Sequence, residues 1–155
     1  MTILKVKALS TAQKEAVLQL WNNEYPAQLC FRSVQELEQY LYALSKPVHY
    51  IAGNPSLPCA AWAFAFERDG ERWFAIIVDG RLQKTGIGTA LLDALKADHK
   101  VLNGWLTDHD SYQKQDGQVY FSPRDFYLKN DFTLCPGERL ETEKLSAVKI
   151  SWSRS

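Results

Sequence analysis

The feature that most constrains this fold is a strand, a glycine-containing turn and a helix that follow one another without a gap. Residues 73–78 (WFAIIV) are aromatic and β-branched, which is typical of a buried strand. Residues 90–96 (ALLDALK) repeat apolar side chains at helical spacing, so a helix is expected to begin near Gly86. The first-turn N–H groups of such a helix have no partners within it and lie at the positive end of its dipole. A phosphate group placed there would be bound by the main chain.

Spacing distinguishes the glycine motifs that bind phosphate. A P-loop requires Lys after its second glycine, but Gly86 is followed by Ile87. The dinucleotide-binding fingerprint requires a third glycine or alanine where this chain has Leu91. What remains is Gln83-x-x-Gly86-x-Gly88. For the glycine pair alone, a turn that uses glycine for its positive φ is the simpler explanation.

A second motif follows about forty residues downstream, at residues 126–132 (FYLKNDF). The two motifs resemble the acyl-CoA pyrophosphate loop and the second signature of the GNAT superfamily of N-acetyltransferases. Asp131 stands where that signature usually has glycine, and Asp tolerates the left-handed conformation that stops a helix. Where family members often carry an Asn upstream of the Tyr, this chain has Ser122-Pro123, which is typical of a helix start.

The expected order of elements agrees with this resemblance. Strands are expected near 3–9, 48–52, 59–67, 72–79, 101–107, 132–136 and 145–152, and helices over about 11–21, 34–44, 86–98 and 122–130. A capping box at residues 33–36 opens the second helix, and Pro47 stops it. The resemblance implies an α/β fold of mixed α+β type, with a central mixed, mostly antiparallel sheet of about seven strands flanked by about four helices. We expect one GNAT-like acetyltransferase domain over residues 1–155.

The strand at 59–67 has two different faces. Because side chains alternate, Ala61, Ala63 and Ala65 lie on one face and Trp62 and Phe64 on the other. The alanine face favours a helix at close range, and the alternative is room for a ligand.

The resemblance implies a set of cofactor-binding residues. The pantetheine arm of acetyl-CoA would enter between the strands at 72–79 and 101–107. Its main-chain partners would be Ile76, Ile77 and Val78. The pyrophosphate would lie on the glycine loop: Gln83, Lys84, Thr85, Gly86, Ile87, Gly88 and Thr89.

The resemblance also assigns catalytic candidates. Tyr127 would protonate the departing thiolate, and an aromatic core residue is the alternative explanation. A base for the amine could be Asp79, at the end of one strand, or Glu67, at the end of its neighbour. Further candidates are Asp108, His109 and Asp110, which follow the strand at 101–107. Each is also explained as a solvated strand-end charge. The histidines lack ligand spacing, so no metal is expected.

Composition excludes several classes of function. Eighteen basic and eighteen acidic residues give no net charge, so nothing favours a nucleic acid or anionic membrane as partner. Three widely spaced cysteines without a CxxC pair indicate a reducing compartment. The N-terminus alternates like a strand, without a signal-peptide core, and we expect a cytoplasmic protein.

We therefore expect an acetyl-CoA-dependent N-acetyltransferase that acts on a primary amine of a small molecule or protein. The alternative is a non-catalytic acyl-CoA-binding sensor or partner-binding module. The resemblance places Trp21, Glu24, Tyr25, Phe31 and residues 108–121 around the acceptor, the last being either a mobile flap or a surface insertion. The family often forms homodimers, and the last strand either pairs at an exposed edge or completes its own sheet.

Overall fold

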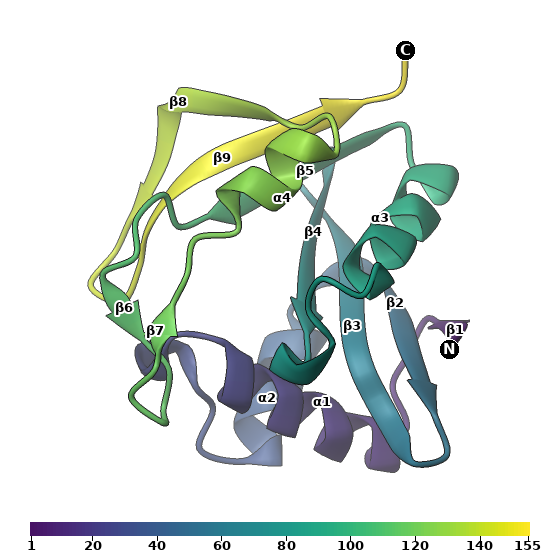
Figure 1. Ribbon diagram of the computed structural model, residues 1–155. Coiled ribbons are helices and arrows are strands. Elements are labelled where there is room, and N and C mark those ends of the chain that lie inside the picture. The colour runs from purple at the N-terminus through teal and green to yellow at the C-terminus, as the bar shows by residue number, and fades with distance from the viewer.

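The computed structural model describes residues 1–155, which form a seven-stranded sheet in the order β1-β2-β3-β4-β5-β9-β8, with four α-helices (Figure 1). Neighbouring strands are antiparallel except for β4 and β5. The sheet strands are β1 (Thr2–Val6), β2 (Ser45–Asn54), β3 (Leu57–Arg68), β4 (Glu71–Val78), β5 (Val101–Leu106), β8 (Thr133–Glu141) and β9 (Ser146–Ser153). The helices are α1 (Thr11–Glu24), α2 (Val34–Tyr42), α3 (Ile87–Asp98) and α4 (Arg124–Lys129), with short 3-10 turns η1 (Ala27–Leu29) and η2 (Gly80–Leu82). The expected mixed, mostly antiparallel sheet with four helices is confirmed.

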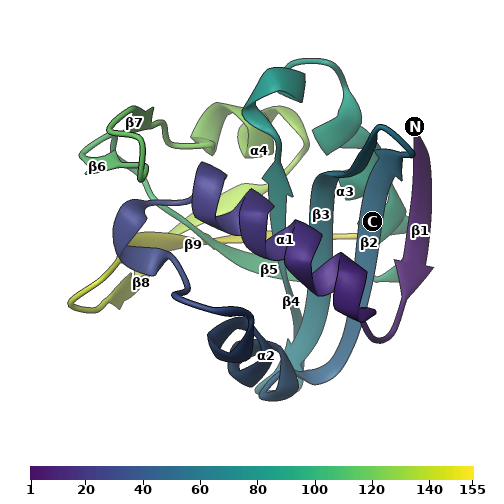
Figure 2. The ribbon, with the colours of Figure 1, turned by 90° about the horizontal axis from the view of Figure 1, so that it is seen from below.

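Two apolar cores lie on opposite faces of the sheet. Figure 2 shows α1 and α2 on one side of the central strands and α3 on the other. On one face the alanines of β3 pack in the same core as Leu91, Leu92 and Leu95 of α3. On the other face Trp62 and Phe64 pack with the apolar side chains of α1 and α2. The alanine face therefore admits a helix at close range, the more ordinary of the two explanations offered by the sequence.

Local hydrogen bonds explain where the first helices begin and end. At α1 the Ser10 hydroxyl accepts from the Gln13 N–H while the Gln13 side chain accepts from the Ser10 N–H, which forms a reciprocal capping box. The capping box expected at residues 33–36 is only half formed, because Glu36 accepts from the Arg32 N–H instead of from Ser33.

Prolines mark two places where the expected strand boundaries were wrong. Pro47 lies inside β2, where a shift in register between Ser45 and Val48 removes the need for its missing N–H. Pro136 lies inside β8, at a second register shift between Cys135 and Arg139, so β8 runs five residues beyond the expected end at 136.

Residues 108–121 contain a two-stranded hairpin, β6 (Tyr112–Gln113) paired with β7 (Val119–Tyr120). The Tyr112 hydroxyl accepts from the Ser146 N–H at 2.8 Å, and the Lys114 ammonium pairs with the Glu24 carboxylate at 3.1 Å. The segment is thus tied to β9 and to the end of α1, although it has few apolar anchors.

The last strand completes its own sheet. β9 pairs with β5 on one side and with β8 on the other, so it offers no edge to a second copy of the chain. None of the helices is both long and apolar enough to cross a membrane.

Candidate functional site

The two parallel strands of the sheet separate soon after they meet. β4 and β5 share a single register pair, Trp73 with Asn103, whereas β4 pairs with β3 along eight residues. Beyond Trp73 the strands diverge towards their carboxyl ends, with β4 leading to the glycine loop and β5 to the hairpin (Figure 1). One edge of β4 therefore has main-chain groups without partners in the sheet.

The register of β3 and β4 identifies these groups. The Asp79 N–H donates to the Ala60 carbonyl at 2.8 Å, so the opposed pair Ala61 and Val78 is a non-hydrogen-bonded pair of the ladder. Alternation then directs the main-chain groups of Val78 and Ile76 away from β3, towards the opening between β4 and β5.

Ile77 differs from its two neighbours. It opposes Trp62 at a hydrogen-bonded position of the ladder, so its main-chain groups already pair with β3. Its side chain is buried in the core beneath α1. The expectation that Ile77 bonds an added chain is therefore wrong, whereas Ile76 and Val78 have the required orientation.

The glycine loop ends in an open helix N-terminus. Gly86 has a φ of 91°, which favours glycine, and it precedes α3. The first main-chain hydrogen bond of the helix runs from the Ala90 N–H to the Gly86 carbonyl. The N–H groups of Ile87, Gly88 and Thr89 consequently have no acceptor in the protein.

The loop before Gly86 is polar and exposed. The Gln83 amide lies 3.5 Å from the Val78 carbonyl, while the Lys84 ammonium has no ion pair. The Thr85 hydroxyl donates to the Leu82 carbonyl, which closes the turn. The loop and the open edge of β4 thus form one continuous set of donors and acceptors.

Tyr127 lies on α4, in the core between the sheet and α3. Its ring packs against Phe74 and Phe132, with centroids 5.8 Å and 5.3 Å away. Its hydroxyl makes no hydrogen bond within the protein, although only 7% of the residue is exposed. Burial, and secondarily the Tyr120 phenol, raise the pKa of Tyr127, so this hydroxyl keeps its proton. The hydroxyl oxygen itself is not fully buried, so it is open to solvent and available to a ligand.

Two further phenols lie near Tyr127. The rings of Tyr25, which ends α1, and Tyr120, on β7, have centroids 6.3 Å apart, and neither hydroxyl has a partner in the protein. Burial raises the pKa of Tyr120 to about 12, and burial together with the nearby phenols raises the pKa of Tyr25. Sequence reasoning had placed Tyr25 near the acceptor but had not singled out Tyr120, because no local pattern links the hairpin to α1.

Trp21 and Phe31, which were also expected around the acceptor, make contacts that hold α1 to the segment after it. Trp21 donates to the Leu29 carbonyl at 2.8 Å and packs against Phe31, with centroids 4.8 Å apart. Both contacts connect α1 to the segment that follows it. Glu24 accepts from the Gly80 N–H and pairs with Lys114, so it joins η2, which precedes the glycine loop, to the hairpin.

The structure places the two expected bases in different surroundings. Asp79 lies next to the loop, where the Arg81 guanidinium binds it at 2.7 Å and lowers the pKa of the Asp79 carboxyl. Glu67 lies at the other end of the β3–β4 ladder, opposite Arg72, and pairs with Lys46 at 3.0 Å. Glu67 lies six positions along β3 from Ala61, roughly 20 Å away, and Ala61 is opposite Val78. The two expected bases are therefore not brought together.

The two acids that follow β5, Asp108 and Asp110, already accept hydrogen bonds within the protein. Arg139 binds Asp108 through two hydrogen bonds of 2.8 Å and 3.1 Å, which lower the pKa of Asp108. Asp110 accepts from the Ser122 N–H. No group of three or more His, Cys, Asp or Glu side chains is arranged to hold a metal ion.

No family model and no curated protein matches the sequence. Solved structures do match the fold over nearly the whole chain. An aminoglycoside 6'-N-acetyltransferase complexed with coenzyme A is 15% identical, with a TM-score of 0.72, covering 99% of this chain and 97% of that one. A GNAT-family protein from Bacteroides thetaiotaomicron is 13% identical, with a TM-score of 0.69, covering 100% and 88%. The ribosomal-protein-S18-alanine N-acetyltransferase from Escherichia coli is 16% identical, with a TM-score of 0.62, covering 98% and 94%.

Proposed function

We propose that this chain, which has the GNAT fold, is an N-acetyltransferase that moves an acetyl group from acetyl-CoA to a primary amine of a small molecule or protein by direct attack on the thioester. One observation carries the proposal. The open edge of β4 leads on one side to three unpaired N–H groups at the start of α3, and α4, which packs against β4, carries the unpaired hydroxyl of Tyr127. A site for a long phosphate-bearing ligand thus adjoins a proton donor.

The cofactor would be bound mainly by the main chain. The outward groups of Ile76 and Val78 would pair with the amides of the pantetheine arm as an added strand does. The N–H groups of Ile87, Gly88 and Thr89 would bind the pyrophosphate, aided by the helix dipole. Lys84, which has no ion pair, would add a charge at the same loop, while Gln83 and Thr85 shape it.

Tyr127 would act as the general acid. When bound, acetyl-CoA supplies an activated acyl group whose leaving thiolate needs a proton as the new amide bond forms. The Tyr127 hydroxyl is protonated at neutral pH because burial raises its pKa, and it donates to no other group. The phenolate left behind would regain its proton from solvent.

The proton of the attacking amine would leave through water. Asp79 is held ionised by Arg81, and a carboxyl with a lowered pKa is a weak base. The Glu67 carboxylate is paired with Lys46 at 3.0 Å. We therefore expect Asp79→Asn to retain at least a third of the parent kcat, and a loss of a hundredfold or more would make Asp79 the base.

Two measurements test the function in sequence. Calorimetric titration with acetyl-CoA, with adenosine diphosphate as the control for phosphate binding alone, should show saturable binding that is stronger for acetyl-CoA. Release of free CoA is then followed with a panel of amines. Absence of acetyl-CoA binding to the folded protein would refute the cofactor site.

The same panel tests the alternative of a non-catalytic acyl-CoA-binding module. Acetyl-CoA binding without amine-dependent CoA release across a broad panel would favour that module. The hydroxyl of Tyr127 favours the enzyme, because a site that only binds acyl-CoA needs no proton donor and this hydroxyl has no partner within the protein.

A further inference from the structure

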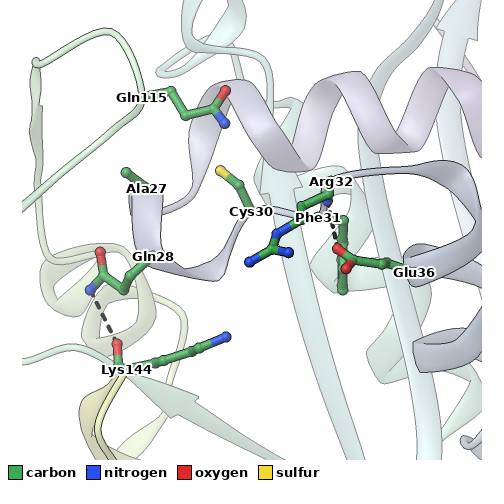
Figure 3. Close-up of a pocket in the computed structure, with 8 residues that line it drawn as sticks. All are labelled: Ala27, Gln28, Cys30, Phe31, Arg32, Glu36, Gln115 and Lys144. Carbon is green, nitrogen blue, oxygen red and sulfur yellow. Dashed lines mark hydrogen bonds between the residues drawn. The ribbon is translucent and has the colours of Figure 1, made fainter.

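A surface cavity of about 520 Å³ lies between η1, the start of α2, the hairpin and the β8–β9 turn (Figure 3). Its walls come from four segments that are distant in the sequence. The Gln28 amide donates to the Lys144 carbonyl at 3.1 Å, which ties η1 to the β8–β9 turn. Gln115, at the tip of the hairpin, lines the opposite wall.

The cavity is positively charged. The guanidinium of Arg32 and the ammonium of Lys144 both line it, and neither takes part in any of the eight ion pairs of the protein. The one acid in the lining, Glu36, accepts from the Arg32 main-chain N–H at 2.6 Å. The Cys30 thiol is neutral, because burial raises its pKa. Two cations therefore face one acid that is already hydrogen-bonded.

The cavity is formed in part by the segments that follow Tyr25 and precede Tyr120 in the chain. Tyr25 is separated from η1 by Pro26 alone, and Tyr120 belongs to the same hairpin as Gln115. The ion pair between Lys114 and Glu24 holds that hairpin against the end of α1. The cavity therefore lies next to the segments that carry Tyr25 and Tyr120, whose rings are in edge-to-face contact.

We propose that the acceptor carries a carboxylate in addition to its amine, and that Arg32 and Lys144 bind this carboxylate. The inference rests on the proposed transferase function. A guanidinium binds a carboxylate through two parallel hydrogen bonds, and the ammonium supplies a second charge. The same two cations would repel an acceptor that carries several positive charges and no acid.

Binding of two matched peptides tests the proposal. Each has a free N-terminal alanine and an amidated C-terminus, and the next two residues are glutamates in one peptide and glutamines in the other. By calorimetry we expect the glutamate peptide to bind about tenfold more tightly, and Arg32→Gln and Lys144→Gln each to reduce its affinity by about tenfold. Neither variant should change the affinity of the glutamine peptide. Lys100→Gln, which removes an exposed cation at the start of β5, is the matched control and should bind both peptides as the parent does.

Each outcome decides one of the two proposals. Three results would overturn the carboxylate site. The two peptides could bind equally, neither could bind, or both cavity variants could bind the glutamate peptide as the parent does. If the glutamate peptide binds through Arg32 and Lys144 but its addition releases no CoA from acetyl-CoA, the carboxylate site stands and the proposed transfer to this amine fails. If both peptides are acetylated with equal KM, the proposed transfer stands and the carboxylate site fails.

Discussion

Gly88 lies directly beneath the ring of Phe126: a Cβ atom placed on Gly88 would be 3.3 Å from Phe126 Cζ and 3.6 Å from Val78 Cγ2. Gly88 belongs to the glycine loop and Phe126 to the second signature, two motifs almost forty residues apart in the sequence. The absence of a side chain at Gly88 therefore lets α4 approach the start of α3. The same contact positions the helix that carries Tyr127.

We expect Gly88→Val to destabilise the protein by about 1–3 kcal/mol, because the added methyl groups would force Phe126 and Val78 apart. Chemical denaturation measures this change. Gly137→Val is the control, since a Cβ at Gly137 meets nothing within 4 Å, and it should change stability by less than about 0.5 kcal/mol. Equal stability of Gly88→Val and the parent would show that α4 does not depend on this contact.

Local patterns in the sequence were sufficient to predict most helices and strands. The alanine face of β3, the helix start at Gly86 and the helix around Tyr127 each have a signal within a few residues. The other features depend on which residues pair with one another across neighbouring strands. The assignment of Ile77 failed because its orientation depends on which residues of the β3–β4 ladder are hydrogen-bonded.

Glu67 shows a different limit of sequence reasoning. The sequence Arg68-Asp69-Gly70 is typical of a hairpin turn, and an antiparallel hairpin puts the end of one strand beside the start of the next. Glu67 and Asp79 both end strands, yet they lie at opposite ends of one ladder. The Lys114–Glu24 pair joins residues 90 positions apart, and nothing local could predict it.

We expect Gly86→Glu to weaken acetyl-CoA binding by about a hundredfold, because a carboxylate beside the pyrophosphate adds repulsion of roughly 3 kcal/mol. A Cβ at Gly86 meets no neighbour, but φ is 91°, so any side chain costs on the order of 1 kcal/mol of stability. Gly86→Ala has the same strain without the charge and is the control. Similar affinity of the two variants would mean that the pyrophosphate does not lie on this loop.

We expect Tyr127→Phe to lower kcat by about a hundredfold or more while changing the Kd of acetyl-CoA by less than about threefold. The hydroxyl has no partner in the protein, so its removal should leave stability unchanged within about 0.5 kcal/mol. Tyr50→Phe is the matched control. It removes a hydroxyl that donates to Asp98 at 2.8 Å and should cost about 1 kcal/mol of stability without affecting kcat. A full rate in Tyr127→Phe would exclude Tyr127 as the acid.

His49 makes the stability of the fold depend on pH. The imidazole is 3% exposed, its Nδ1 accepts from the Trp62 indole at 3.1 Å, and burial lowers the pKa of His49 from its ordinary 6.5 to about 4. Between these two values the unfolded chain binds a proton that the folded protein does not. The contribution of His49 to the free energy of unfolding is therefore largest above pH 6.5. It decreases as the pH drops towards 4, by about 3 kcal/mol in all.

His49→Gln should remove this dependence. The glutamine oxygen can still accept from Trp62, but the side chain does not titrate, so the free energy of unfolding should change far less between pH 7 and pH 4.5. We expect the variant to be less stable than the parent at pH 7, because the new side chain fits the site less well. The two curves should converge as the pH falls. The lowered pKa of His99 acts in both proteins and cancels in their difference. Parallel curves for variant and parent would show that His49 is not the group responsible.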